Sequence, residues 1–372
     1  MYNTIIIGLG CVGTSTICEL SKETSNILGI EKFDTLNEKG SSHGDSRIMR
    51  LAYHEGEKYV PLLKESIKKW KELEKEADEK LFHQTGTLTI GKENSKKYIK
   101  SKETCDSMGI EYRNYTGSKA SDIFDGWDLP DYYNVMFQPD GGLINNKKCM
   151  ASQLEKAKDN GAEIHKFEEV ICWEKKNNII TVRTNKDTYQ TENLVITSGP
   201  WAKNINNRIS NLLDIERHIS VKIRTEKPLY KENQFPPWIL DTGDRKFYGM
   251  SNYNKDEIKL GETTEKEIIS DMSKFNREVI EKEKEECISF CKEFLDSKIK
   301  EEISSISCPL THTPDGDFII DEIDNSRIFI GVGLSGHGFK LSNVIGEILA
   351  KLVLEENISY DIDHFSLDRF KT

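Results

Sequence analysis

The sequence predicts a two-domain α/β (α+β) protein in which a Rossmann-like parallel sheet is interleaved with a largely antiparallel sheet. Three observations support this fold class. An apolar strand near the N-terminus runs directly into a glycine-rich turn and a helix. Between about 220 and 306 the pattern changes to strands with one charged helix. A second strand, glycine-rich loop and helix at 328–354 indicate that the C-terminus returns to the first sheet.

The first expected element is a strand at 2–7 that is wholly apolar from Ile5 onward. It ends at three glycines spaced GxGxxG, before a helix through Leu20. Gly8 allows a tight turn, Gly10 lets the backbone approach a pyrophosphate, and Gly13 lets the helix pack closely on the strand. The start of the helix adds N–H groups and a positive dipole end. This arrangement predicts a dinucleotide site, and a glycine-rich turn without a ligand is the alternative.

A second expected strand at 27–30 ends in Glu31. A carboxylate at this place accepts hydrogen bonds from the diol of a ribose, which strengthens the prediction of a dinucleotide site. The polar stretch 40–50 follows, and we expect a loop and helix start that contact the ligand. Arg47 and Arg50 are three residues apart and would share one face of a helix, so both could serve one anion. A capped surface helix is the alternative.

The middle of the chain predicts alternating helices and strands that lead back to the first sheet. Helices are expected at 57–80, 95–108 and 148–160, and strands at 82–90, 134–142, 163–170, 172–183 and 194–197. The turn 197–201 after the last of these strands is suited to passing close to a bound cofactor. The antiparallel region then predicts strands near 219–225, 247–251 and 258–261 and a charged helix at 264–295, and we assign it to substrate binding.

Composition excludes several classes of function. The net charge of -11 and the pI near 5.4 argue against non-specific binding to nucleic acid. No apolar segment reaches the roughly 18 to 20 residues of a membrane span, and the N-terminus lacks the pattern of a signal peptide, so we expect a cytoplasmic protein. Short lysine runs such as Lys96–Lys97 are interpreted as solvated surface charge. The eight cysteines have no metal-site spacing, so we expect reduced thiols and no metal.

Three stretches together resemble the monomeric sarcosine oxidase family, which includes N-methyltryptophan oxidase and related FAD-dependent amine oxidases of the D-amino-acid-oxidase-like superfamily. They are GLGCVG at 8–13 with Glu31, SSHGDSRIMRLAYHEGEKYVPL at 41–62, and CPLTHTPDGDFIID at 308–321 with IFIGVGLSGHGFKLSNVIGEIL at 328–349. The resemblance spans nearly the whole chain. It implies FAD rather than NAD, a monomer, and a p-hydroxybenzoate-hydroxylase-like fold. We expect 1–80, 145–215 and 309–372 to form the FAD-binding domain, and 81–144 and 216–308 the substrate domain.

The resemblance also implies roles for individual residues. Cys308 matches the cysteine that is bonded through sulfur to the flavin 8-methyl carbon; a small buried residue is the alternative. Arg50 and Lys340 match the pair that holds a substrate carboxylate. Lys259 matches a lysine near flavin N5 that promotes reduction of O2, with a surface lysine as the alternative, and Tyr248 matches an active-site tyrosine. The expected cofactor-binding residues are Gly8, Gly10, Gly13, Glu31, Lys32, Ser42, His43, Ser46, Arg47, Val170, Gly199, Trp201, Cys308, Gly336, His337, Gly338 and Lys340.

The implied function is an FAD-dependent oxidase of a secondary-amine or N-methyl amino acid, which forms an imine that hydrolyses while O2 is reduced to H2O2. Thr263 and Leu310 depart from the family's histidine and tyrosine, so the resemblance implies an amine that is bulkier or more apolar than sarcosine. The alternatives are a deglycating oxidase of fructosyl amino acids, an amine dehydrogenase with another electron acceptor, and a non-catalytic flavoprotein.

Overall fold

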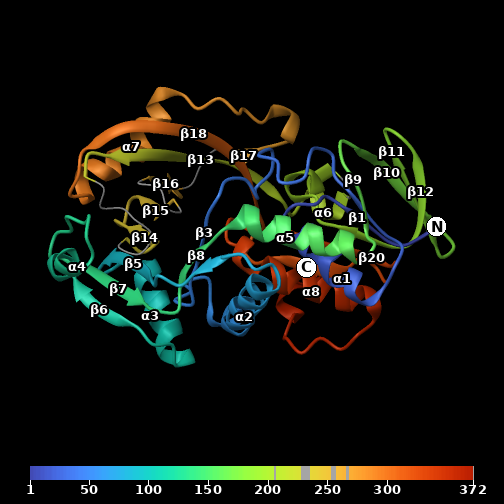
Figure 1. Cartoon of the computed structure of the whole chain (residues 1–372), viewed down its shortest axis with the longest axis horizontal. Coiled ribbons are helices and arrows are strands. Elements are labelled where there is room, and N and C mark those ends of the chain that lie inside the picture. The colour runs from blue at the N-terminus through green and yellow to red at the C-terminus, as the bar shows by residue number, and fades with distance from the viewer. Residues whose placement is uncertain (205–206, 228–234, 253–256, 265–267, 372) are drawn as a thin grey trace.

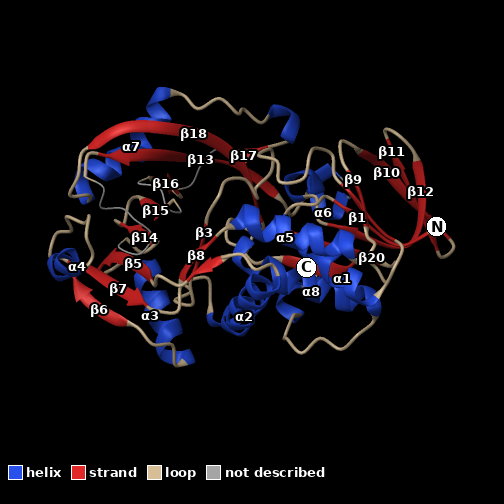
Figure 2. Cartoon of the chain, in the orientation of Figure 1, coloured by secondary structure: helices blue, strands red, loops and turns tan. Residues whose placement is uncertain are grey.

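The computed structural model describes the whole chain except residues 205–206, 228–234, 253–256, 265–267 and 372 (Figure 1). Two large sheets lie side by side along the long axis of the molecule, with α1, α5 and α8 beside one sheet and α3 and α7 beside the other (Figure 2). One sheet is mainly parallel and the other mainly antiparallel. The predicted fold class is therefore confirmed.

The first sheet holds the glycine-rich turn. Its strand order is β10-β11-β12-β1-β2-β9, with β20 beside β12 and β19 beside β20. The central strands β1, β2, β9, β12 and β20 are parallel, and α1 packs against both α5 and α8. The bounds are β1 Tyr2–Ile7, β2 Ile27–Ile30, β9 Glu163–His165, β10 Val170–Lys176, β11 Ile179–Thr184, β12 Thr188–Ile196, β19 Ile319–Glu322, β20 Ile328–Val332, α1 Cys11–Glu23, α5 Asn146–Asp159 and α8 Ser342–Leu354.

The second sheet has the order β17-β13-β16-β15-β14-β5-β7-β6, and β18 pairs along the whole of β13. All its pairs are antiparallel except β14 with β5, where two separate parts of the chain meet. The bounds are β5 Thr87–Lys92, β6 Arg113–Thr116, β7 Tyr133–Gln138, β13 Asp214–Thr225, β14 Trp238–Asp241, β15 Lys246–Ser251, β16 Ile258–Glu262, β17 Ile268–Ile269, β18 Ile299–His312, α3 Lys96–Met108, α4 Gly117–Ile123 and α7 Glu281–Phe294.

A small third sheet and several short helices join the two large sheets. The small sheet has the order β3-β8-β4. The bounds are β3 Arg47–Met49, β4 Phe82–His83, β8 Gly142–Ile144, α2 Val60–Glu76 and α6 Asn207–Ser210, with 3-10 helices at Glu57–Tyr59, Gly199–Asn204, Met272–Lys274, Phe339–Leu341, Asp363–Phe365 and Leu367–Phe370. The domain boundaries predicted from the sequence stay a prediction, since β13 and β18 each cross one of them.

Three expectations for single elements were wrong. The charged helix begins at Glu281 rather than 264, and residues 265–267 lie outside the described part of the chain. The strand expected at 82–90 is two strands, because Gly86 takes a positive φ of 76° and lies against the Phe137 ring. The stretch 40–50 ends in strand β3 and contains no helix, so Arg47 and Arg50 do not share a helix face.

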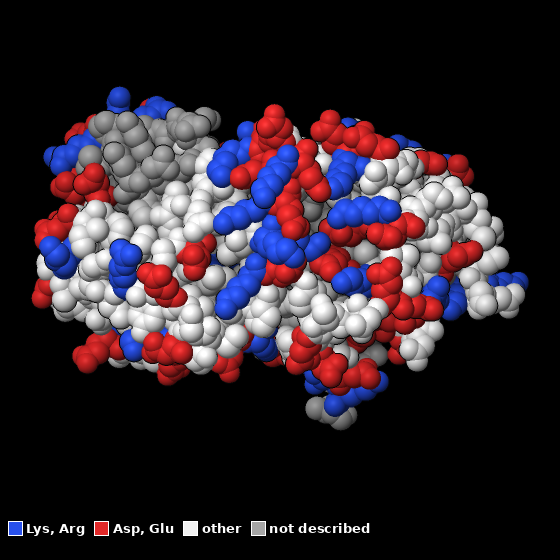
Figure 3. All heavy atoms as spheres, turned by 60° about the horizontal axis from the view of Figure 1, so that its bottom comes forward, with Lys and Arg blue, Asp and Glu red and all other residues white. Residues whose placement is uncertain are grey.

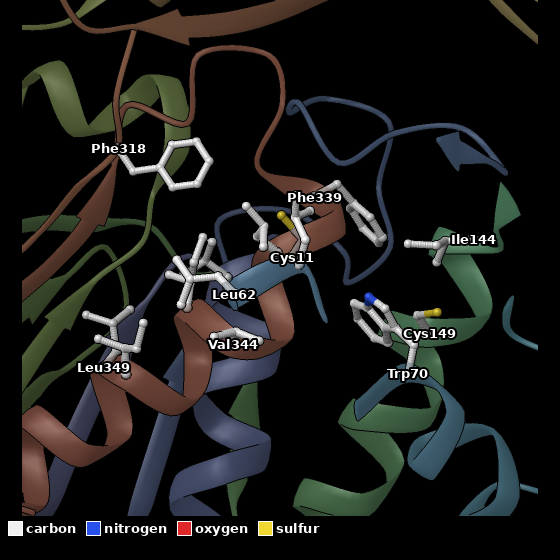
Figure 4. Packing of buried hydrophobic residues seen from close by; sticks show 14 of the residues in the cluster. Cys11, Leu62, Trp70, Ile144, Cys149, Phe318, Phe339, Val344 and Leu349 are labelled. Carbon is white, nitrogen blue, oxygen red and sulfur yellow. The ribbon is translucent and has the colours of Figure 1, made fainter. Parts of the chain in front are cut away.

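Large apolar side chains join α2 to the C-terminal segment in the main core. Trp70 of α2 stacks on Phe339 with ring centroids 6.2 Å apart, and its indole N–H donates to the Lys340 carbonyl. Figure 4 shows Trp70, Phe339 and Cys11 in this core, with Val344 and Leu349 of α8 beside them. Packing thus fixes the position of the loop before α8, which carries several of the expected site residues.

Charged side chains of both signs are interspersed over the face drawn in Figure 3. Within the described residues no helix is long and apolar enough to cross a membrane. Those residues also include no group of three or more His, Cys, Asp or Glu side chains placed to hold a metal ion. All eight cysteines are free thiols.

Gly346 tests the contact between α1 and α8. A Cβ atom at Gly346 would lie 2.5 Å from Ser15 Cβ and 2.6 Å from the Ser15 carbonyl carbon. Helix propensity alone would make Gly346→Ala stabilising by about 1 kcal/mol. We expect instead that overpacking lowers the free energy of unfolding by about 1–3 kcal/mol. Urea unfolding measures the sign, and a stabilised variant would show that the two helices separate easily.

Candidate active site

A cavity of about 1030 Å³ lies between the two large sheets. Its walls come from the turn after β1, the polar loop before β3, the turn after β12, strands β15, β16 and β18, and the loop 333–340. The carboxyl ends of β1, β2, β12 and β20 therefore open into it, which is where ligands bind in open α/β sheets. Its lining residues come both from the predicted dinucleotide site and from the predicted substrate domain.

The glycine-rich turn forms one end of this cavity. Gly8 has a φ of 88°, and a Cβ there would lie 2.7 Å from Ser198 Cα. A Cβ at Gly13 would lie 2.0 Å from the Gly8 carbonyl oxygen, so this glycine permits close packing of α1 on β1. Gly10 is the N-cap of α1 and offers no capping side chain, which leaves N–H groups of the first turn for an anion.

Glu31 lies beside this turn and is only 7% exposed. Its carboxylate accepts hydrogen bonds from the backbone N–H groups of Leu9 at 2.9 Å and Phe33 at 3.0 Å. Burial raises the pKa of Glu31, and the backbone hydrogen bonds, which lower it, only partly offset this effect. Because a carboxylate has about four acceptor positions, Glu31 retains capacity for two hydroxyl groups. The carboxylate fits the ribose position of a dinucleotide.

Unsatisfied polar atoms provide an independent sign of a ligand. Both ring nitrogens of His43 and the hydroxyl of Ser198 are buried without a hydrogen-bond partner among the described residues. Both side chains line the cavity. Burial, and then the charge of Arg47, holds the pKa of His43 well below its ordinary value, so the ring is neutral. Buried polar atoms without partners are costly, so a polar ligand such as a dinucleotide fits here.

Most of the other expected cofactor residues also line the cavity. Lys32 forms an ion pair with Glu169 at 2.6 Å, and the rings of Trp201 and Phe33 are 5.4 Å apart. Ser42 accepts a hydrogen bond from the Cys11 N–H at 3.0 Å. The lining includes Gly8, Gly10, Glu31, Lys32, Ser42, His43, Arg47, Val170, Gly199, Trp201, Cys308, Gly336, His337, Gly338 and Lys340. Gly13 and Ser46 are expected site residues that do not line it.

Arg47 and Arg50 both reach the cavity but have different partners. The Arg47 guanidinium donates to the carbonyl oxygens of Ser41, His43 and Ser46, so it holds the polar loop together. Arg50 donates to the Ala52 carbonyl and lies over another part of the cavity wall. The shared helix face on which a common anion was predicted is absent, so the common anion stays an untested prediction.

Arg50 and Lys340 converge on one aromatic ring although they are 290 residues apart in the sequence. The Arg50 guanidinium carbon lies 4.4 Å and the Lys340 Nζ 5.3 Å from the centroid of the Tyr53 ring. The two cations are 5% and 7% exposed. Burial, and then repulsion from Arg50, lowers the pKa of Lys340 to about 7. A bound carboxylate would relieve this repulsion and accept charge-assisted hydrogen bonds.

Glu55, which the sequence reasoning did not single out, already pairs with Arg50. Both of its oxygens accept hydrogen bonds from one guanidinium nitrogen, at 2.5 and 2.8 Å. Burial raises the pKa of Glu55, but the Arg50 charge outweighs burial and holds it well below its ordinary value. A substrate carboxylate must therefore share Arg50 with Glu55. The only sequence feature that could have identified Glu55 as a site residue is its position five residues after Arg50.

His337 is held in one tautomer by its neighbours. Its Nε2 lies 3.1 Å from the Gly316 carbonyl oxygen and must donate there, so Nδ1 accepts from the Tyr53 hydroxyl at 2.7 Å. Burial lowers its pKa to about 4, so the ring is neutral near pH 7. Lys340 donates to the His337 carbonyl at 2.8 Å. This network holds Lys340 in the cavity wall and Tyr53 behind it.

Lys259 and Tyr248 lie on neighbouring strands of the second sheet and face the same cavity. Lys259 is 4% exposed, and burial, followed by the charge of Arg47, holds its pKa well below the ordinary value. It is therefore a buried cavity lysine and not a surface one. The Tyr248 hydroxyl lies 3.1 Å from His218 Nε2, and burial raises the pKa of this tyrosine.

Cys308 is 1% exposed and lies on β18 opposite His218 of β13. Cys308 lines the cavity, and the Ser41 hydroxyl of the polar loop donates to the neighbouring Pro309 carbonyl at 2.6 Å. Burial raises the pKa of Cys308 to about 11, while Arg47 and Lys259 act in the opposite direction. Thr263 and Leu310, the two departures from the family pattern, also line the cavity.

Comparison with known proteins gives consistent results. A family model described as "FAD dependent oxidoreductase" matches residues 3–352. Monomeric sarcosine oxidase of Bacillus sp. (strain NS-129) is 30% identical, over 99% of this chain and 97% of that protein. N-methyl-L-tryptophan oxidase of Yersinia pestis (strain Pestoides F) is 28% identical over the full length of both. The solved structure of NikD, an unusual amino acid oxidase, has a TM-score of 0.88 at 20% identity, with 98% and 97% of the chains covered.

The Arg50–Glu55 pair yields a testable expectation. In Glu55→Gln the guanidinium of Arg50 keeps its burial but loses its counter-charge, so we expect the free energy of unfolding to fall by about 2 kcal/mol. Binding of a small carboxylate such as propionate should become tighter, because Arg50 is no longer shared. Urea unfolding and calorimetric titration measure the two effects. The exposed Glu57→Gln is the matched control, and weaker carboxylate binding in Glu55→Gln would contradict this interpretation.

Proposed function

Because the chain belongs to the FAD-dependent oxidoreductase family, we propose that it is an oxidase of a secondary-amine or N-methyl amino acid. The observation that carries this proposal is that Arg50 and Lys340 converge on the Tyr53 ring and both line the cavity that also contains the glycine-rich turn. Two buried cations at this place favour a substrate with a carboxylate. The two curated relatives, which are oxidases of sarcosine and of N-methyl-L-tryptophan, support the same class of substrate.

The residues that fit the cofactor are those of the glycine-rich end. Glu31 would accept hydrogen bonds from the ribose, the start of α1 would bind the pyrophosphate, and His43 and Ser198 would find hydrogen-bond partners in the cofactor. When bound, FAD would accept a hydride equivalent from the carbon next to the substrate nitrogen and pass the electrons to O2, giving H2O2 and an imine that hydrolyses.

The chain's own residues would orient the substrate. Arg50 and Lys340 would bind the carboxylate, and the fully buried Tyr53 ring, which both cations contact, would keep water from reaching them from behind. The neutral His337 would keep Lys340 in place through its carbonyl oxygen. Fixing the carboxylate at one end leaves the amine and its neighbouring carbon to extend into the middle of the cavity. Orientation of this kind lowers the entropy cost of reaction.

Lys259 would act on oxygen. An ammonium buried near the reacting centre stabilises the negative charge that develops as O2 receives an electron. The low pKa of Lys259 means that its charged form gains much from a nearby anion. This charge would favour O2 over other electron acceptors.

Lys259→Met tests this role. We expect reoxidation of the reduced enzyme by O2 to slow by about 100-fold or more, the scale of losing one electrostatic contact to a developing anion. Anaerobic reduction by substrate should change by much less. Stopped-flow absorbance measures both steps. Lys222→Met on the adjacent strand is the matched control, because Lys222 pairs with Asp45 at 2.7 Å and does not line the cavity. Equal slowing of both half-reactions in Lys259→Met would refute the assignment.

We also propose that Cys308 holds the cofactor covalently. Its Sγ would bond to the 8-methyl carbon of the flavin as the thiol proton and a hydride equivalent leave, and O2 would accept the two electrons. Arg47 and Lys259 favour the thiolate, which is the nucleophilic form, although burial opposes it. The position of Cys308 in the wall next to the polar loop supports this step.

Acid precipitation of the purified protein tests the bond. Yellow colour should remain in the pellet of the wild type and move to the supernatant for Cys308→Ala, because only a covalent bond survives unfolding. Cys172→Ala, which removes an exposed free thiol, should behave as the wild type does. Release of colour from the wild type would leave FAD as a non-covalent cofactor and exclude the bond to Cys308.

A further inference from the structure

Lys97 is a cation of the active-site cavity that the sequence interpretation had assigned to the surface. It lies in the first turn of α3 and lines the cavity together with Arg50, Glu55 and Lys340. The preceding Lys96 is exposed. Successive residues of a helix point in directions about 100° apart, so one lysine of the pair faces solvent and the other faces the cavity.

The position of Lys97 is unfavourable in the protein without a ligand. Its ammonium group forms no hydrogen bond or ion pair with any residue that the structure describes. Burial lowers its pKa to about 8, with Glu55 acting against this and Arg50 in the same direction. A cation in the first turn of a helix is also repelled by the positive end of the helix dipole. No contact within the described structure compensates these costs.

The charges around Lys97 leave an excess of positive charge. Arg50, Lys340 and Lys97 are cations, and Glu55 is the carboxylate that pairs among them. The two histidines of this wall, His54 and His337, are neutral because burial lowers the pKa of each. One substrate carboxylate on Arg50 and Lys340 would therefore leave one positive charge without a partner.

Two further charged groups face Lys97 from the sheet beneath it, and they do not remove this excess. Lys246 lowers its pKa and Asp241 raises it, so their effects oppose each other. The Asp241 carboxylate already accepts hydrogen bonds from the Ser95 hydroxyl and the Gly243 N–H, both at 2.9 Å. Asp241 is therefore committed to the turn before α3 and is not the partner of Lys97.

We propose that Lys97 binds a second carboxylate of the substrate, so that the preferred substrate is a secondary-amine amino acid with two carboxylates. This inference rests on the proposed function, in which Arg50 and Lys340 bind the first carboxylate. The second carboxylate would belong to the end of the substrate that reaches the first turn of α3. This substrate differs from the more apolar amine that Thr263 and Leu310 led us to expect, because a half-buried cation without a partner among the described residues disfavours an apolar group.

Paired substrates that differ only in charge test the proposal. N-methyl-L-glutamate and its side-chain amide, N-methyl-L-glutamine, have nearly the same shape, as do iminodiacetate and its monoamide. We expect kcat/KM to be about 10- to 100-fold higher for the diacid of at least one pair, which is the scale of one charge-assisted hydrogen bond. Lys97→Met should abolish this preference and leave kcat/KM for the amide within about twofold of the wild-type value. Lys97→Arg should restore part of it, and Lys96→Met should have no effect.

A diacid preference that persists in Lys97→Met, or no preference in the wild type for either pair, would overturn the proposal. A stability measurement separates it from a purely structural role. Because Lys97 is unpaired, Lys97→Met should unfold at the same or a higher urea concentration than the wild type, whereas a structural lysine would lower the midpoint.

A binding experiment distinguishes failure of this inference from failure of the proposed function. Thiodiacetate and its monoamide carry sulfur in place of the amine nitrogen and bind without amine oxidation. Calorimetric titration should show tighter binding of the diacid to the wild type and equal binding of both to Lys97→Met. If no amine is oxidised but this difference holds, the oxidase function fails and the carboxylate site at Lys97 stands. If amines are oxidised and this difference is absent, the assignment of Lys97 fails alone.

Discussion

The pairing of β12 with β1 on one side and β20 on the other is the constraint on which the active site depends. Backbone hydrogen bonds in parallel register place Leu194 between Ile5 and Ile328, which come from opposite ends of the chain. The turns that follow these three strands are therefore brought to one edge of the sheet. That edge supplies the glycine-rich turn, the turn after β12 and the loop before α8. The cavity therefore forms only when the N-terminal strand β1 and the C-terminal strand β20 both pair with β12.

The second sheet completes the cavity and determines its electrostatics. It contributes Lys259, Tyr248 and Cys308, and the helix that follows β5 contributes Lys97. Removing ammonium groups from water is costly, and low pKa values at Lys340 and Lys97 record that cost. A site with several buried cations and few counter-charges is prepared for an anionic ligand. A bound anion would offset this cost.

The sequence predicted the fold class and most of the cavity wall, because both depend on local patterns. GxGxxG after an apolar strand predicts a strand, a tight turn and a helix. Cys308, Lys259 and Lys340 were identified differently, through motifs that resemble a known family. The helix expected at 264–295 and the shared helix face of Arg47 and Arg50 failed for a common reason. Charge and polarity alone do not distinguish a helix from an exposed loop or strand, and tertiary pairing, as of β3 with β8, decides between them.

The sequence by itself determined the glycine-rich turn and the acidic residue that follows β2, and its family resemblance predicted Arg50 and Lys340 as ligands of a substrate carboxylate. Only the tertiary structure decided that Glu55 pairs with Arg50, that Arg50 and Lys340 both contact the Tyr53 ring, and that Lys97 faces the cavity while Lys96 faces solvent. The reason is physical. Residue types and local spacing fix backbone conformation, but the burial of a charge depends on which distant segments pack around it, and no local pattern encodes that.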